Sequence, residues 1–219
     1  MNDWISKLLD NPDLRRMGHG QRHEDNNLGL GWIYYALARA LRAKSVVVIG
    51  SYRGFVPLVF ARALADNLEK GTVTFIDPSF VDDFWKDPQA VQSYFTSYGC
   101  HNIRHFLMTT QQFVESGMVG SLGLVDLVFV DGFHSEEQAR FDYEAFQERL
   151  APGGMVLFHD TAGRRLSNIY GNERAYECRV KDLVEALQRD PRLQVFDVPL
   201  FEGVALVRRA EIGETARGQ

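Results

Sequence analysis

Two acidic residues follow short apolar runs that are typical of buried strands. Asp131 comes directly after VDLVFV (125–130), and Asp160 comes directly after MVLFH (155–159). Short runs rich in β-branched and aromatic residues predict the buried strands of a parallel sheet. Because neighbouring parallel strands end at the same edge of a sheet, we expect both carboxylates to face one crevice.

Two carboxylates at such a distance repel each other unless a cation or a proton lies between them. No Lys or Arg stands beside either acid in the sequence. Carboxylate oxygens are hard ligands that suit Mg²⁺, Ca²⁺ or Mn²⁺, so Asp131 and Asp160 predict a divalent-cation site. The alternative is structural: Asp131 starts the Asp-Gly turn, and Asp160 caps the segment that follows it.

Histidines accompany these acids. His134 follows Asp131 by three residues, and its imidazole could take a proton from a substrate hydroxyl, because histidine titrates near neutral pH. We expect a catalytic pair of His134 and Asp131, with His134 in the crevice but apart from the charged ligands. The alternatives are a metal ligand or a helix cap. We expect His159 to point to the opposite face of its strand. His19 and His23, in GHGQRHEDNN, are expected to be exposed loop residues, in a segment that could fold over the site as a lid.

A glycine-containing turn and a third acid predict a nucleoside ligand. Gly50-Ser51-Tyr52-Arg53-Gly54 separates a predicted strand (45–50) from a predicted helix (55–66), with GxxxG spacing instead of the GxGxxG that closes around a pyrophosphate. This looser turn suits a ligand without phosphates, such as one with a methionine tail. Asp77 ends TVTFID (72–77), where a carboxylate can accept both hydroxyl hydrogens of a ribose. The alternatives are an ordinary strand-to-helix turn and an Asp-Pro turn.

Strands and helices alternate along the chain, which predicts a doubly wound, mostly parallel seven-stranded α/β sheet. The chain is expected to close with an antiparallel pair, LQVFDVPL and GVALVRR. We expect an N-terminal extension or lid at 1–27, one domain at 28–209 and a polar tail at 210–219. A further strand is expected at 103–108. One helix is expected over residues 30–43, and two others begin near residues 88 and 135. A last helix is expected to contain Tyr176, Val180, Leu183 and Leu187.

Composition excludes several classes of protein. A net charge of −5 and a pI near 5.7 argue against a nucleic-acid-binding surface. No apolar run is long enough for a membrane span, and no basic block suggests a membrane surface. The two cysteines have no metal-ligand spacing and fit a reducing compartment, and the first residues lack the layout of an export signal. We therefore expect a cytoplasmic protein.

Three segments together resemble the class I S-adenosylmethionine-dependent methyltransferases, in particular the small-molecule O-methyltransferases of family 24 and of the macrolide-sugar type. They are IGSYRGFVPLVFARAL, FID and LVFVDGFHSEEQARFDYEAFQERLAPGGMVLFHDT. The resemblance covers about residues 28–209 and is most specific over 131–160. It implies a Rossmann-like methyltransferase fold, which ends in an antiparallel strand where a plain dinucleotide-binding domain ends in a parallel one.

The resemblance also implies roles for individual residues. Gly50, Ser51 and Gly54 would line the methionine end of the cofactor, and Asp77 would hold its ribose. Asp131, which would also contact the cofactor, and Asp160 match the metal pair of the cation-dependent members, and His134 matches the histidine of their DGxH motif.

The chain departs from the family pattern at three places. Val48 stands where an acid is frequent, and Phe133 stands where the x of DGxH is usually acidic. Met108-Thr109-Thr110 replaces the acid that usually meets the adenine amine, so that Thr109 or Thr110 would accept this hydrogen bond through a hydroxyl.

The resulting hypothesis is an enzyme (EC 2.1.1 class) that transfers the methyl group of S-adenosylmethionine to a hydroxyl of a small molecule, with or without Mg²⁺ or another divalent cation. A non-catalytic adenosyl-binding module is the alternative. An NAD(P)-dependent oxidoreductase is disfavoured by GxxxG and by the antiparallel ending. The expected partner is the small-molecule acceptor, with no nucleic acid and no membrane. A homo-oligomer and the identity of the acceptor stay open.

Overall fold

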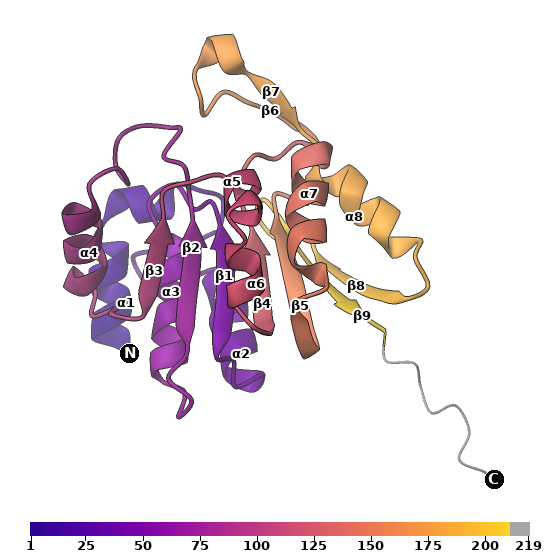
Figure 1. Cartoon of the computed structure of the whole chain (residues 1–219). Helices are drawn as coiled ribbons and strands as arrows, with labels where there is room; N and C mark the ends of the chain where they lie inside the picture. The colour runs from indigo at the N-terminus through magenta and orange to yellow at the C-terminus, as the bar shows by residue number, and fades with distance from the viewer. Residues whose placement is uncertain (211–219) are drawn as a thin grey trace.

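Seven strands form one sheet in the order β3-β2-β1-β4-β5-β9-β8 (Figure 1). This computed structural model describes residues 1–210 of the chain. The first five strands of the sheet are parallel, and β9 pairs antiparallel with both β5 and β8. The predicted doubly wound sheet with an antiparallel end is thereby confirmed. The strands are β1 (Ser45–Ile49), β2 (Thr72–Ile76), β3 (Ile103–Phe106), β4 (Val125–Val130), β5 (Leu150–His159), β8 (Leu193–Val198) and β9 (Val204–Arg209).

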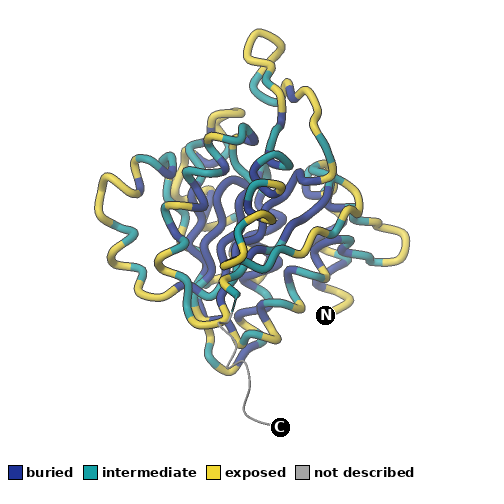
Figure 2. Tube along the Cα trace, turned by 90° about the vertical axis from the view of Figure 1, so that its right-hand side faces the viewer, coloured by how far each residue is buried: buried dark blue, intermediate teal, exposed yellow. Residues whose placement is uncertain are grey.

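Helices cover both faces of this sheet, and alternate residues of each strand point to opposite cores. In β1, Val46 and Val48 belong to one core, while Val47 and Ile49 belong to the other. The central strands are accordingly buried throughout (Figure 2). The first core packs against α1 (Asn2–Leu9), α2 (Gly31–Ala40), α3 (Phe55–Ala65) and α4 (Pro88–Ser97), and the second against α5 (Thr110–Glu115), α6 (Met118–Ser121), α7 (Glu136–Gln147) and α8 (Val180–Gln188).

The first 27 residues contribute to the core. The buried side chains of α1 and of the following 3₁₀ turn (Pro12–Arg15) pack into the first core, and Trp4 Nε1 donates a hydrogen bond to the backbone oxygen of Tyr98 at 2.9 Å. The division at residue 27, with a lid before it, stays a prediction. Of the tail predicted at 210–219, residues 211–219 lie outside the described part of the chain.

Two segments differ from the prediction. Tyr176 was expected in the last helix, but it lies in β7 (Tyr176–Cys178), which pairs with β6 (Arg165–Ser167) in a separate hairpin beyond the sheet (Figure 1). This pairing takes up the segment, so α8 begins only at Val180. Strand β5 also starts earlier than predicted, at Leu150, because the sequence Pro152-Gly153-Gly154 forms an irregularity in the pairing with β4 and does not end the strand.

The end of β1 requires glycine. Gly50 has a positive φ of 69°, and a Cβ there would collide with the backbone of Asp131 and Gly132. Gly50→Ala is therefore expected to lower the free energy of unfolding by more than the about 1–2 kcal/mol that a left-handed backbone alone costs an alanine. Gly153→Ala is the matched control, because Gly153 has a φ of 77° with no atom within 4 Å of the added Cβ. Urea unfolding of both variants measures the difference, and equal losses would contradict the collision.

Candidate active site

A cavity of about 910 Å³ opens at the carboxyl ends of the parallel strands. Its lining comes from the turns after β1, β2, β4 and β5 and from the β6–β7 hairpin. A volume of this order is typical of small-molecule and cofactor sites. All three strand-end acids predicted from the sequence, Asp77, Asp131 and Asp160, line it.

The glycine turn after β1 lies at one side of this cavity. Gly50 and Ser51 line it directly. The Ser51 hydroxyl is turned inward and accepts a hydrogen bond from Val56 N at 3.4 Å, at the start of α3. Gly54, with a φ of 85°, lies behind the turn, where a Cβ would come within 3.0 Å of the Trp85 ring.

Asp77 lies at the end of β2, beside this turn. Its carboxylate accepts a hydrogen bond from Ser79 N at 2.7 Å. Burial, together with the nearby charge of Asp131, raises the pKa of Asp77 to about 6, although the backbone N–H groups of Ser79 and Ser51 act in the opposite direction. Trp85 is buried against Phe75 and Phe95 as a core anchor, whereas Phe80 is exposed at the cavity.

Asp131 and Asp160 lie together with His134 between them. His134 Nδ1 is 2.6 Å from Asp160 Oδ2, and its Nε2 is 3.3 Å from Asp131 Oδ1 without a hydrogen-bonding geometry. Burial opposes a charge on His134, but the two carboxylates outweigh it and hold the pKa of His134 well above 6.5. The expectation that His134 stays apart from the charged group is wrong, because the turn after β4 brings the imidazole between the two strand ends.

Asp160 also meets a cation from the β6–β7 hairpin that follows it in the chain. Arg165 Nη2, from β6, lies 2.7 Å from Asp160 Oδ2, while Asp160 Oδ1 is buried without a hydrogen-bond partner among the described residues. Burial opposes the charge of Asp160, but His134, His159 and Arg165 hold its pKa well below the usual range. Only one oxygen of Asp160 is therefore available to a further ligand.

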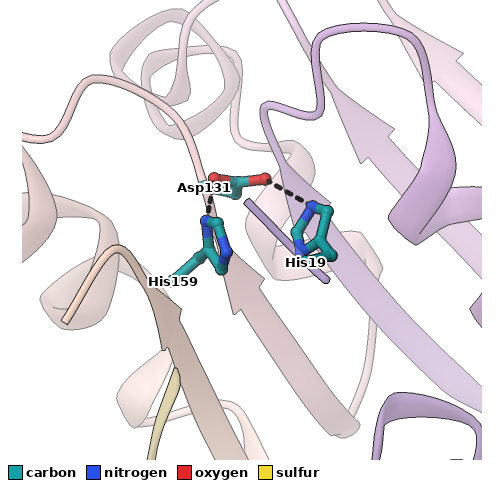
Figure 3. A group of neighbouring side chains, drawn as sticks. All are labelled: His19, Asp131 and His159. Atoms are coloured by element: carbon teal, nitrogen blue, oxygen red, sulfur yellow. Dashed lines mark hydrogen bonds and ion pairs between the residues drawn. The ribbon is translucent and has the colours of Figure 1, made fainter. Parts of the chain in front are cut away.

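Two more histidines contact Asp131 (Figure 3). His159 Nδ1 is 3.1 Å from Asp131 Oδ1, and His19 Nε2 is 3.9 Å from Asp131 Oδ2. Burial would raise the pKa of Asp131, yet His159, His134 and His19 lower it to about 2. His159 was expected to face away from the acids. It does not, because the backbone of Asp160 turns to a φ of 60° and ends the alternation of the strand.

The expectation that His19 is exposed is wrong. Its side chain is 1 % exposed, and burial and the neighbouring His159 lower its pKa to about 3. Residues 19–30 fold back on themselves: Arg22 and Asn27 exchange two backbone hydrogen bonds, and Leu30 N donates to His19 O at 2.8 Å. This turn carries the imidazole inward, whereas His23 stays exposed, as predicted, and pairs with Asp10.

Sequence analysis missed Asp142, on α7. This carboxylate is 1 % exposed and lines the cavity. One oxygen accepts a hydrogen bond from Gln138 Nε2 at 2.8 Å, and the other has no hydrogen-bond partner within residues 1–210. Burial raises the pKa of Asp142 to about 6. The available signal was an acid between Ala139 and Tyr143 on the apolar face of the helix.

Both predicted threonines lie near Asp142 at the start of α5 and line the cavity. Thr109 caps the helix by accepting a hydrogen bond from Gln112 N at 3.2 Å. The Thr110 side chain acts against the burial that raises the pKa of Asp142.

Aromatic rings form the wall contributed by the β6–β7 hairpin. Phe133 stacks on Tyr176 with ring centroids 4.0 Å apart, and Tyr170 lies 5.9 Å from Phe133 and 6.0 Å from Tyr176. All three side chains line the cavity. Phe133, which replaces a frequent acid, is thus part of an apolar wall beside Asp131.

Solved methyltransferase structures share this fold. The O-methyltransferase TomG from Streptomyces achromogenes, in complex with SAM, is 15 % identical, with 96 % of both chains covered and a TM-score of 0.64. An O-methyltransferase from Bacillus cereus, in complex with SAH, is 12 % identical, with 96 % of this chain and 92 % of that chain covered and a TM-score of 0.67. At these identities the likeness establishes the fold.

Curated relatives match over part of their length. The catechol O-methyltransferase domain-containing protein 1 of Mus musculus is 26 % identical over 173 residues, which are 78 % of this chain and 62 % of that protein. An uncharacterized protein, y4gI, of Sinorhizobium fredii is 28 % identical over 135 residues, which are 58 % of this chain and 14 % of that protein. The chain thus spans less than two thirds of either relative.

A family model described as a methyltransferase domain (Methyltransf_24) matches residues 47–161, which are just over half of the chain. The matched segment runs from β1 through Asp160 and so contains the glycine turn, Asp77, Asp131 and His134. By this match, the chain belongs to the Methyltransf_24 family of methyltransferase domains.

Proposed function

We propose that this protein transfers the methyl group of S-adenosylmethionine to a hydroxyl oxygen of a small molecule. The observation that carries the proposal is one cavity lined by two chemically different groups of residues. Asp77 and the glycine turn, after β2 and β1, form one group, and Asp131, His134 and Asp160, after β4 and β5, form the other. The family membership and the SAM and SAH complexes of proteins with the same fold support it.

Asp77 and the glycine turn suit the cofactor. Gly50, Ser51 and Gly54 would form the turn beside the methionine part, and Asp77 would accept both ribose hydroxyl hydrogens. Asp142 supplies what Met108-Thr109-Thr110 lacks, because its unpartnered buried oxygen can accept from the adenine amine.

Asp131, His134 and Asp160 suit removal of the proton from the acceptor hydroxyl. The acceptor oxygen attacks the methyl carbon as the carbon–sulfur bond breaks, S-adenosylhomocysteine leaves, and the hydroxyl proton must pass to a base. His134 Nδ1 is held by Asp160 Oδ2 at 2.6 Å. Because the carboxylates hold the pKa of His134 well above 6.5, Nε2 takes that proton near Asp131 only at a pH at which the imidazole is neutral, so turnover should rise with pH. Asp131 would orient the acceptor hydroxyl, and positioning of the two reactants would supply much of the rate.

The donor set also fits a divalent cation. Asp131, which contacts cofactor and acceptor in this proposal, and the unpartnered Oδ1 of Asp160 would hold it. Such an ion would lower the pKa of the acceptor hydroxyl.

Calorimetry tests the cofactor and separates it from a nicotinamide. We expect saturable heat with S-adenosylhomocysteine and none with NAD(P). The opposite result would contradict the proposal. Transfer of a labelled methyl group to a panel of phenols, catechols and sugars then tests catalysis, and tight cofactor binding without transfer to any of them would favour a non-catalytic adenosyl-binding module.

We also propose a cytoplasmic location and a small-molecule partner for this protein. The described residues contain no helix long and apolar enough to cross a membrane. Cys100 and Cys178 are both free and buried, which supports a cytoplasmic location. The net charge of −5 supports a small-molecule partner and not a nucleic acid.

A further inference from the structure

We propose that His19, Asp131 and His159 bind a divalent transition-metal ion of the Zn²⁺ or Fe²⁺ kind, and that this ion takes the place of the hard cation, such as Mg²⁺, for which Asp131 and Asp160 alone would be the ligands. The three side chains converge from the N-terminal segment, the end of β4 and the end of β5 (Figure 3). The ion would lie beside Asp131, where the proposed function places the acceptor. The role of the ion in catalysis rests on that proposed function, whereas the binding of the ion does not.

The spacing of the three groups suits one ion. Asp131 Oδ1 is 3.1 Å from His159 Nδ1, Asp131 Oδ2 is 3.9 Å from His19 Nε2, and the ligand atoms of all three residues lie within 4.8 Å of one another. A tetrahedral ion about 2.1 Å from each ligand holds the ligand atoms ~3.4 Å apart. The two measured separations lie on either side of that value, so small side-chain movements complete the site.

Burial keeps water away from the candidate ligands. The side chains of His19 and His159 are 1 % and 2 % exposed, and that of Asp131 is 8 % exposed. The imidazoles would therefore bind an ion in a site with little access to solvent, and Asp131 would balance part of its charge.

A second contact orients His19. Its Nδ1 lies 3.2 Å from the hydroxyl of Tyr34, a residue of α2 that is fully buried. In a histidine that binds a metal, the ring nitrogen that does not bind the ion characteristically makes a hydrogen bond. This bond fixes the orientation of the ring and directs the lone pair of the other nitrogen at the ion. For His19 the nitrogen so directed is Nε2, the one that faces Asp131.

The ligand types select the class of metal. Two imidazoles and one carboxylate suit Zn²⁺, Fe²⁺, Co²⁺ or Ni²⁺, whereas Mg²⁺ prefers oxygen ligands and water. Three protein ligands leave a further coordination position open, as in catalytic zinc sites. Asp131 and His159 line the cavity while His19 lies behind them, so that position would face the acceptor.

Metal titration of the full chain, after treatment with a chelator, tests the inference without any turnover. We expect one Zn²⁺ per chain, not displaced by millimolar Mg²⁺. His19→Gln should weaken Zn²⁺ binding by at least about tenfold, since even the outer partners of metal ligands are worth that much. His23→Gln is the matched control, because His23 is in the same segment but exposed, and it should bind Zn²⁺ like the unmodified chain.

Anomalous scattering from Zn²⁺-soaked crystals of the unmodified chain decides the site even if His19→Gln fails to fold. We expect a peak bound to His19, Asp131 and His159. A peak held by Asp131 and Asp160 without His19, no peak, or equal Zn²⁺ affinity in a folded His19→Gln variant would overturn the inference. Calorimetry with S-adenosylhomocysteine on the same samples separates this failure from failure of the proposed function, because loss of cofactor binding with intact metal binding contradicts only the latter.

Discussion

His134→Ala is expected to lower turnover by about 10²–10⁴-fold while the affinity for S-adenosylhomocysteine stays unchanged. His134 lies between the carboxylates of Asp131 and Asp160, with Asp160 holding its Nδ1. Without the imidazole, the hydroxyl proton has no basic nitrogen to receive it. Steady-state kinetics of methyl transfer, together with calorimetry of cofactor binding, measure the two quantities.

Two alternatives for His134 predict other outcomes. A metal ligand at this position would let added metal restore part of the rate. A helix cap would leave turnover intact and lower only stability, but the cap of α7 is Ser135, whose hydroxyl accepts a hydrogen bond from Gln138 N at 3.1 Å. The control is His105→Ala, a histidine of β3 that bonds to the backbone of Asp77 outside the acid cluster. Turnover of His134→Ala within about threefold of the unmodified chain would contradict the role of base.

Asp77→Ala is expected to weaken binding of S-adenosylhomocysteine by about 1.5–3 kcal/mol, which is the scale of hydrogen bonds to a charged group. The carboxylate lies at the end of β2 and lines the cavity beside the glycine turn. Calorimetry measures the change. Asp83→Ala is the control, because the side chain of Asp83 is 84 % exposed in the same loop and pairs with Lys86. An unchanged affinity in Asp77→Ala would place the ribose elsewhere.

The pKa of Asp77 adds a dependence on pH. Burial raises this pKa to about 6, so the carboxylate takes up a proton in the free protein as the pH falls below that value. The protonated acid cannot accept hydrogen bonds from both ribose hydroxyls in the same way. Affinity for S-adenosylhomocysteine should therefore fall as the pH decreases from 7 to 5. This loss should be smaller in Asp77→Ala, in which Asp142, whose pKa burial also raises to about 6, still titrates. Equal pH dependence in the two proteins would exclude Asp77 as the titrating group.

Local sequence was sufficient for the frame of the site. The β-branched runs at β1, β2 and β4 are buried on both faces, as central parallel strands require, so their positions in the chain followed from the pattern alone. Because parallel strands end at one edge, the convergence of Asp131 and Asp160 followed as well. The turn after β1 could also be predicted, because the left-handed backbone at Gly50 favours glycine over other residue types.

The partners of those acids were decided by tertiary structure. His19, Arg165 and Asp142 approach the cavity from the N-terminal segment, the β6–β7 hairpin and α7, and no periodicity links them to Asp131. Even His159, one residue before Asp160, could not be oriented from the sequence, because the reversal of φ at Asp160 breaks the alternation of a regular strand. The local sequence pattern determines where each strand ends. Which charged and polar side chains meet at the strand ends depends on the loops, and tertiary packing sets the course of these loops.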